Sequence, residues 1–214
     1  MDEDLSIINT NTRNEKIKNF FVNNKNKIIL GIIILIIIII GVFSYDKYLE
    51  NKNKEISDNY NATTIDYSDK NKDKTVINLI EIIKKKDPTY SPLSLYFIID
   101  NNLLEDQSEI NSLFDILIQD TSIDREIKNL VIYKKALFNA DNAEESDLLT
   151  MLNPLINSES VWKSHSLYLM AEYFYAKNQT QKAKEFFNKI ISLENSNLEI
   201  RLQAEKRLNR DLSE

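Results

Sequence analysis

The sequence IILGIIILIIIIIGVF, which runs from Ile28 to Phe43, contains no charged residue and no polar side chain. With Ser44 and Tyr45 added, it would form an α-helix roughly 27 Å long, against about 30 Å for the hydrocarbon core of a bilayer. A buried helix of a soluble protein usually carries a polar stripe, and this run has none on any face. Residues 28–45 are therefore predicted to be one transmembrane anchor, which includes Ile28, Gly31, Ile36, Ile40 and Phe43.

The charges on either side of the anchor predict its orientation. Within fifteen residues, five basic residues precede it and three follow it: Arg13, Lys16, Lys18, Lys25 and Lys27 before, and Lys47, Lys52 and Lys54 after. The positive-inside rule then places residues 1–27 in the cytoplasm as a tail and the remainder outside it, in the periplasm if the source is a Gram-negative bacterium. No A-x-A-like cleavage site follows the run, so we expect an uncleaved anchor. Within the tail, Ile17, Phe20 and Phe21 lie at helical spacing in a basic stretch and predict a short amphipathic helix at the membrane surface.

Glycine is confined to the anchor, because Gly31 and Gly41 are the only two in the sequence. The 170 residues from Tyr45 to Glu214 therefore lack the residue that tight hairpins and phosphate-binding loops need. We expect an all-α domain whose helices are joined by Asn- and Asp-based turns, although AT-rich codon usage also explains part of the depletion. The absence of cysteine excludes disulfides, thiol catalysis and cysteine zinc sites. Residues 28–214 hold 22 Lys/Arg and 29 Asp/Glu, and so acidic a domain is a poor binder of nucleic acid.

Apolar patterns of helical spacing recur along residues 73–195 with a nearly constant period. The spacing i, i+4, i+7, typical of the second helix of a tetratricopeptide repeat, occurs four times, with starts 34, 38 and 35 residues apart. These sets are Val76-Ile80-Ile83, Ile110-Phe114-Leu117, Leu148-Leu152-Leu155 and Ala183-Phe187-Ile190. Twelve residues before each start lies the expected close-packing position of a first helix: Thr64, Ile98, Ala136 and Ala171. We therefore predict an α-solenoid of degenerate tetratricopeptide-like helix pairs; an ordinary α-helical bundle is the alternative, because this spacing occurs on any amphipathic helix.

The last unit, Leu167 to Asn195, shows the pattern best. Ala171 is small enough for helix backbones to approach, and Phe174 and Phe187 are expected to fill the gap between helices. Asn178 stands where glycine usually makes the turn, and asparagine tolerates the left-handed backbone conformation better than other non-glycine residues. Residues 46–72 are predicted to be a linker helix and first repeat helix. Residues 196–214 are predicted to be a capping helix with three leucines on one side: Leu198, Leu202 and Leu208.

Together these features resemble one known family, the YfgM-like tetratricopeptide proteins, which are ancillary subunits of the SecYEG translocon of bacterial inner membranes. The resemblance lies in the pre-anchor motif Glu15-Lys16-Ile17-Lys18-Asn19-Phe20-Phe21 and in the final unit around Ala171, Phe174, Ala183 and Phe187. The chain differs from the family in lacking Gly-rich repeats and in keeping only Tyr45 and Tyr48 of the aromatic cluster after the anchor. The resemblance implies a periplasmic domain that associates with translocon subunits and periplasmic folding factors. It implies no catalytic residue.

We expect no catalytic, cofactor-binding or metal site. His165 is the only histidine, and Tyr168 and Leu169 occupy the positions where a second metal ligand would lie on its helix. The acidic clusters Glu144-Glu145 and 211–214 are expected to be solvated helix ends, although spacing alone does not exclude a glycosidase-type carboxylate pair. Aromatic residues that lie close together near His165 are candidates for partner binding, whereas Phe174 is expected in the core. These candidates are Trp162, Tyr173 and Tyr175.

The leading hypothesis is a membrane-embedded platform that binds proteins, without enzymatic activity and without a small-molecule substrate. The alternative is a structural adaptor that organises envelope or cell-division complexes. A membrane-bound hydrolase is a third class, and it would require an activity that depends on His165.

Overall fold

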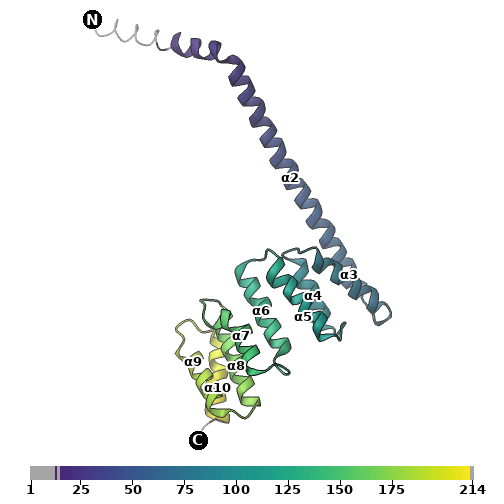
Figure 1. The fold of residues 1–214 in the computed structure, drawn as a ribbon, viewed down its shortest axis with the longest axis vertical. Coiled ribbons are helices and arrows are strands. Elements are labelled where there is room, and N and C mark those ends of the chain that lie inside the picture. Colours follow the sequence, from purple (N-terminus) through teal and green to yellow (C-terminus); the bar gives the residue numbers. More distant parts are fainter. Residues whose placement is uncertain (1–12, 14, 213–214) are drawn as a thin grey trace, which may run out of the picture. The chain divides into compact units, whose positions relative to one another are not determined.

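The computed structural model describes Arg13 and residues 15–212, and no β-strand occurs among them. The predicted tail and capping segment therefore lie partly outside the described residues, at 1–12, 14, 213 and 214. The chain divides into two compact units, Met1–Glu55 and Ile56–Glu214 (Figure 1). Over the described part the protein is all-α, which confirms the prediction made from its composition.

The first unit contains the helical residues 15–23 and the greater part of α2 (Lys25–Ile65). The large apolar side chains of α2 between Ile29 and Phe43 have exposed fractions from 44% to 71%. Among the described helices, α2 is long and apolar enough to cross a bilayer, which fits either a membrane anchor or a signal sequence.

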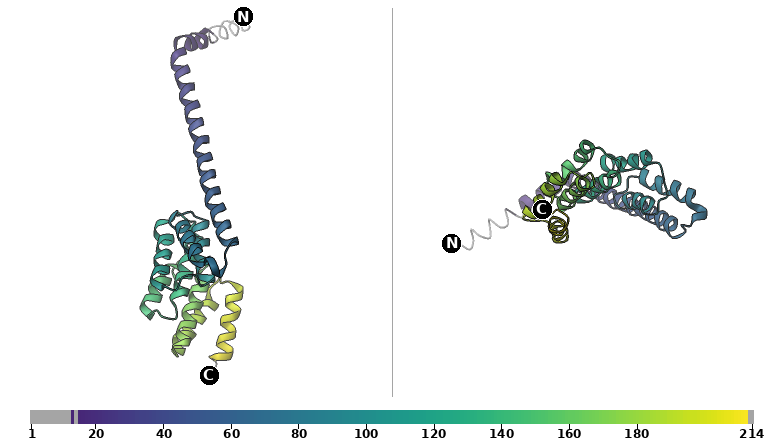
Figure 2. Two further views of the ribbon diagram at one scale, coloured as in Figure 1. Left: turned by 90° about the vertical axis from the view of Figure 1, so that its right-hand side faces the viewer. Right: turned by 90° about the horizontal axis from the view of Figure 1, so that it is seen from below.

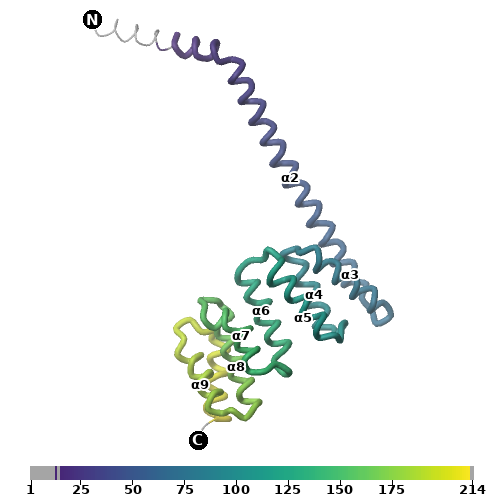
Figure 3. The backbone as a smooth tube through the Cα atoms, in the orientation of Figure 1, coloured from purple at the N-terminus to yellow at the C-terminus, as the bar shows by residue number. Residues whose placement is uncertain are grey.

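In the second unit α2 continues to Ile65, and short helices follow it in antiparallel pairs. The tube in Figure 3 shows the chain reversing direction at the connections between these helices, and the right panel of Figure 2 shows them following one another in chain order. The 3₁₀ turn η1 (Asp69–Asn71) leads into the first of them, and the π-helical turn η2 (Ile116–Asp120) extends α5. The helices are α3 (Lys72–Lys84), α4 (Tyr90–Asp100), α5 (Gln107–Asp115), α6 (Arg125–Asn139), α7 (Glu145–Ile156), α8 (Lys163–Ala176), α9 (Thr180–Ser192) and α10 (Leu198–Asp211).

Short acidic and amide side chains start three of these helices. Asp106 accepts hydrogen bonds from the backbone N–H groups of Ser108 (2.8 Å) and Glu109 (3.2 Å) at the start of α5. Asp124 caps α6 and Asn197 caps α10 in the same way. Each cap satisfies N–H groups that the first helical turn leaves without an intrahelical acceptor.

Left-handed residues end several helices in place of glycine. The φ angles of Lys86, Asn102 and Asn178 are 56°, 49° and 60°. At the end of α8 the Gln179 N–H donates to the Phe174 carbonyl oxygen (2.9 Å), the bond that closes a left-handed helix terminus. The prediction of a left-handed turn at Asn178 is therefore confirmed.

Two clusters of buried apolar side chains stabilise the second unit, and α6 contributes to both. Its Val131 packs with the end of α2 and with α3 to α5, whereas its Ala136 packs with α7 to α10. Val76 and Ile80 are half-buried against the first cluster. The other twelve predicted repeat-packing residues are at most 3% exposed: Ile83, Ile110, Phe114, Leu117, Ala136, Leu148, Leu152, Ala171, Phe174, Ala183, Phe187 and Ile190.

The buried side of α10 differs from the expected leucine face. Leu198 and Leu202 are 71% and 56% exposed, and Leu208 is half-buried. Ala204 is instead fully buried, because α10 packs closely against α9 and α8 at this small residue.

Candidate interaction surface

Six of the polar contacts between helices of the second unit join residues that lie about one helix pair apart in the sequence. Each joins a helix, or the residues next to it, to the helix two places further along the row. The separations are 33 to 37 residues, which is the length of one helix pair. The pairs are Ser57–Tyr90, Lys86–Asp120, Glu126–Ser160, Ser164–Asn197, Glu145–Lys182 and Glu172–Arg207.

Two of these contacts bring the N-terminal ends of α6, α8 and α10 together. The Glu126 carboxylate accepts hydrogen bonds from Ser160 Oγ (2.8 Å) and from the Val161 N–H (3.2 Å). These hydrogen bonds hold the pKa of Glu126 below its usual range, and the bond from Ser160 has the larger effect. The Asn197 N–H donates to Ser164 Oγ (3.2 Å), so α10 begins beside the start of α8.

An exposed apolar side chain lies at each of these three starts. Ile127 is 42% exposed in the first turn of α6, Val161 is 66% exposed just before α8, and Leu198 is 71% exposed at the first residue of α10. We call these three residues the apolar edge. Since neighbouring starts are joined by hydrogen bonds, the apolar edge is the candidate interaction surface of the second unit.

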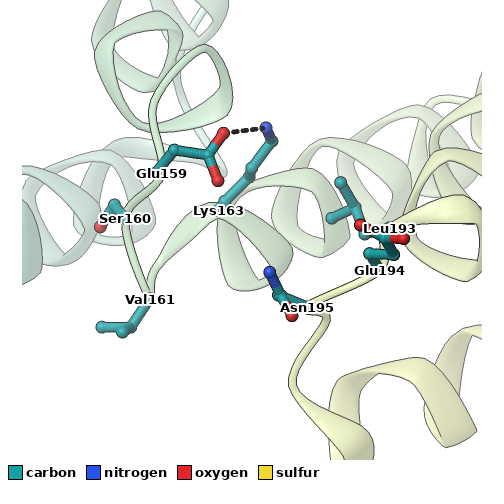
Figure 4. Close-up of a pocket in the computed structure, with 7 residues that line it drawn as sticks. All are labelled: Glu159, Ser160, Val161, Lys163, Leu193, Glu194 and Asn195. Carbon is teal, nitrogen blue, oxygen red and sulfur yellow. Dashed lines mark ion pairs between the residues drawn. The ribbon is translucent and has the colours of Figure 1, made fainter.

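A pocket of about 320 Å³ adjoins the apolar edge, between the connection that precedes α8 and the one that precedes α10. Glu159 and Lys163 form an ion pair at 3.9 Å on one side of it, and Figure 4 shows Val161 extending in another direction. Its Ser160 hydroxyl is already bonded to Glu126, and no histidine lines the pocket. The arrangement therefore offers charge and hydrogen bonds to a partner but no paired nucleophile and base.

Trp162, a predicted partner-binding residue, joins α8 to α6. Its indole Nε1–H donates to the Glu126 carbonyl oxygen (3.1 Å), and its ring stacks on Tyr133 with centroids 5.7 Å apart. His165 lies 5.0 Å from the same ring, and burial lowers the pKa of its imidazole. Tyr133, Trp162 and His165 thus form a half-buried aromatic cluster at the start of α8, next to Val161 of the apolar edge.

Tyr175, the second predicted partner-binding residue, is half-buried and covered on one face by the Arg207 guanidinium of α10, 4.8 Å from its ring centroid. Arg207 also forms a two-pronged ion pair with Glu172 of α8 and a 2.7 Å contact with Asp211. The hydrogen bonds with Glu172, and then with Asp211, raise the pKa of Arg207. Tyr175 is thereby part of the contact between α8 and α10.

Tyr173, the third predicted partner-binding residue, is only 8% exposed. Its hydroxyl donates to the carbonyl oxygen of Ala143 (3.1 Å), in the connection that precedes α7. This position differs from the exposed one expected of a recognition residue. The reason is that the aromatic ring fills the space between α8 and the preceding helix pair, where its hydroxyl finds an acceptor.

The structure does not bring Trp162, Tyr173 and Tyr175 into one patch, and the sequence pattern does not single out Ile127 and Val161. The sequence marks Ile127 and Val161 only weakly, as apolar residues close to a helix start and outside the i, i+4, i+7 stripe.

Among the residues that the structure describes, no group of three His, Cys, Asp or Glu side chains is placed to hold a metal ion.

Comparison with protein-family models, curated proteins and solved structures finds no match to this chain. Its role is accordingly inferred from its own residues, above all from the apolar helix α2 and the contacts between successive helix pairs.

Proposed function

We propose that this protein is a single-span membrane protein whose second unit is an α-solenoid of tetratricopeptide-like helix pairs that binds protein partners beside the bilayer. The observation that carries the proposal is that one helix serves both units. α2 contains the exposed apolar run of residues 29–43 and also Ile56, which is 1% exposed in the core of the second unit. A binding domain tethered in this way gains effective concentration at the membrane without new contacts.

The repeat register supports the solenoid. Six polar contacts between alternate helices have separations of 33 to 37 residues, close to the 34-residue tetratricopeptide period. Ala136, Ala171 and Ala204 follow one another at intervals of 35 and 33 residues on α6, α8 and α10, and all three are fully buried. Small residues at equivalent positions let successive first helices approach closely, which is how a stack of pairs buries a continuous core.

The apolar edge supports protein binding. Exposed Ile127, Val161 and Leu198 lie beside a pocket with acidic and basic walls, the mixture of apolar and polar groups typical of protein interfaces. The negative charge of residues 28–214 favours a partner of this class over nucleic acid.

The proposed place of action is the bacterial inner membrane, with residues 1–27 in the cytoplasm and the helix pairs in the periplasm. The basic residues before the anchor and the resemblance of residues 15–21 to the translocon subunits support this orientation. The proposed partners are subunits of the Sec translocon and periplasmic folding factors that receive secreted chains.

Photo-crosslinking in cells tests the proposal. A crosslinker at Val161 or Leu198 is expected to capture translocon subunits or periplasmic chaperones, and one at exposed Ala176, at the opposite end of α8, is the matched control. Protease added to spheroplasts should digest the helix pairs and spare residues 1–27. Capture of cytosolic proteins alone, or protection of the helix pairs from protease, would contradict the proposal.

A further inference from the structure

The junction between helical residues 15–23 and α2 is an ordered turn. The Asn24 N–H and its side-chain Nδ2 both donate to the Phe20 carbonyl oxygen, at 3.0 and 2.9 Å. The Ile28 N–H in turn donates to the Asn24 carbonyl oxygen at 2.9 Å, within the first turn of α2. The two helices are therefore connected through a defined geometry at Asn24.

The helix before this turn has an apolar face that no other described residue covers. Ile17, Phe20 and Phe21 are 47%, 60% and 56% exposed and fall on one side of a helical wheel. Lys16 and Lys18 flank that side, where their long stems can reach from an apolar layer into water. This arrangement suits a helix that lies in the plane of a membrane surface.

A shallow open groove of about 330 Å³, which we call the cavity, lies at the junction. Phe21 and Val22 form one wall, Ile28 and Ile29 form the other, and Lys25 is the one charged side chain among the five that line it. The cavity lies at the start of a predicted membrane span, where the hydrocarbon layer meets the headgroup layer. Its apolar side chains suit the acyl chains of a lipid, and its single ammonium group suits the phosphate of the headgroup.

The charge of this segment is opposite to that of the rest of the chain. Residues 13–27 carry five basic residues and one acidic residue, Glu15, whereas the whole chain has a net charge of −6. Basic residues near an anionic bilayer surface attract acidic lipid headgroups, so the segment as a whole is complementary to them.

We propose that the junction binds one anionic phospholipid, with its acyl chains against Phe21, Val22, Ile28 and Ile29 and its phosphate paired with Lys25. The inference rests on the part of the proposed function in which α2 spans a bilayer. A free phosphate would match the ammonium of Lys25 but leave the four apolar walls unused, which is why a lipid is favoured.

The test uses the full chain in vesicles. Because the chain contains no cysteine, Asn23→Cys places a single fluorophore beside the cavity without changing a lining residue. Nitroxide-labelled phosphatidylglycerol and phosphatidylcholine, compared at equal mole fraction, report by quenching which headgroup lies at the junction. Quenching by phosphatidylglycerol is expected to indicate an association about fivefold stronger than that of phosphatidylcholine.

Two matched variants separate a site from general surface attraction. Lys25→Gln is expected to remove the approximately fivefold preference, whereas Lys27→Gln, which removes a charge outside the cavity, should change it by less than about twofold. Equal quenching by both lipids would overturn the inference. So would equal losses in the two variants, or abolition of the preference by excess inorganic phosphate.

An alkaline wash of the vesicles distinguishes failure of this inference from failure of the proposed function. Protein that stays in the bilayer without a lipid preference overturns the lipid site alone. Protein that the wash releases overturns both the span and the site.

Discussion

At Asn178 the backbone adopts a left-handed conformation, and this single residue determines how α8 ends and α9 begins. Such conformations cost a non-glycine residue about 1–2 kcal/mol, and asparagine less than most. The glycine-free second unit therefore relies on asparagine and lysine at positions where glycine is usual.

Asn178→Gly is expected to be more stable than Asn178→Ala by about 1 kcal/mol. Glycine adopts a positive φ without strain, whereas the Cβ of alanine clashes with the backbone there and alanine has no side-chain hydrogen bond to compensate. The free energy of unfolding of the detergent-solubilised chain, followed by far-UV circular dichroism in urea, measures the difference. Ala176→Gly, at the last residue of α8, should instead lose up to about 1 kcal/mol. Equal stability of the two Asn178 variants would contradict the role of the left-handed turn.

His165 should make the stability depend on pH. Burial beside Tyr133 and Trp162 lowers the pKa of His165 from its ordinary 6.5; the backbone of Val161, and then the carboxylate of Glu199, oppose the shift without reversing it. Below pH 6.5 the unfolded chain binds the proton first, so the contribution of His165 is present above that pH and is lost as the pH falls through the lowered native pKa.

Replacing this histidine isolates its contribution. His165→Phe should lose less stability than the wild type when the pH falls from about 7.5 to 5.5, a range in which ordinary carboxylates do not titrate. Urea midpoints at several pH values within the range measure the two slopes. Parallel slopes would show that the native pKa of His165 is not lowered.

At the scale of the element, α10 carries polar residues at two positions where α8 carries apolar ones. Gln203 and Arg207 stand 33 residues after Met170 and Phe174, the apolar residues through which α8 packs on α9. Arg207 instead turns back to pair with Glu172.

Arg207→Ala should loosen α10 and destabilise the protein by about 1–3 kcal/mol, because it removes charge-assisted hydrogen bonds to partly buried carboxylates. Arg207→Lys should recover only part of this loss, since an ammonium group cannot form the two-pronged pair with Glu172. Hydrogen exchange of the α10 amides measures the loosening. Arg210→Ala, at a more exposed arginine that pairs with Asp211, should have little effect, and equal exchange in the Arg207 and Arg210 variants would refute the bridging role.

At the scale of the whole molecule, the last ten residues of α2 belong to the second unit, and Ile56 lies in its core. Ile56 is 1% exposed, and Tyr60 packs against Tyr90 with ring centroids 5.5 Å apart. The Tyr90 hydroxyl donates to Ser57 Oγ at 2.7 Å. Removing the anchor from the chain therefore leaves the helix pairs intact only if the cut precedes these residues.

Ile56→Ala is expected to destabilise the second unit by about 2–5 kcal/mol, the usual cost of deleting a buried isoleucine side chain. Leu49→Ala, a matched change seven residues earlier in the same helix, lies in the first unit and should leave the urea midpoint of the helix pairs unchanged. If both variants unfold at the wild-type midpoint, the end of α2 does not stabilise the second unit.

The sequence by itself determined the apolar helix α2, the all-α composition of the described residues, the left-handed turn at Asn178 and most of the buried stripe from Ile83 to Ile190. Each of these depends on residues within a few turns of one another, where helical period, side-chain volume and φ preference act directly. Only the tertiary structure decided that Tyr173 is buried against Ala143, that Arg207 covers Tyr175, and that Ile127, Val161 and Leu198 lie at neighbouring helix starts. Those positions depend on contacts about one helix pair apart, which a local apolar pattern does not specify.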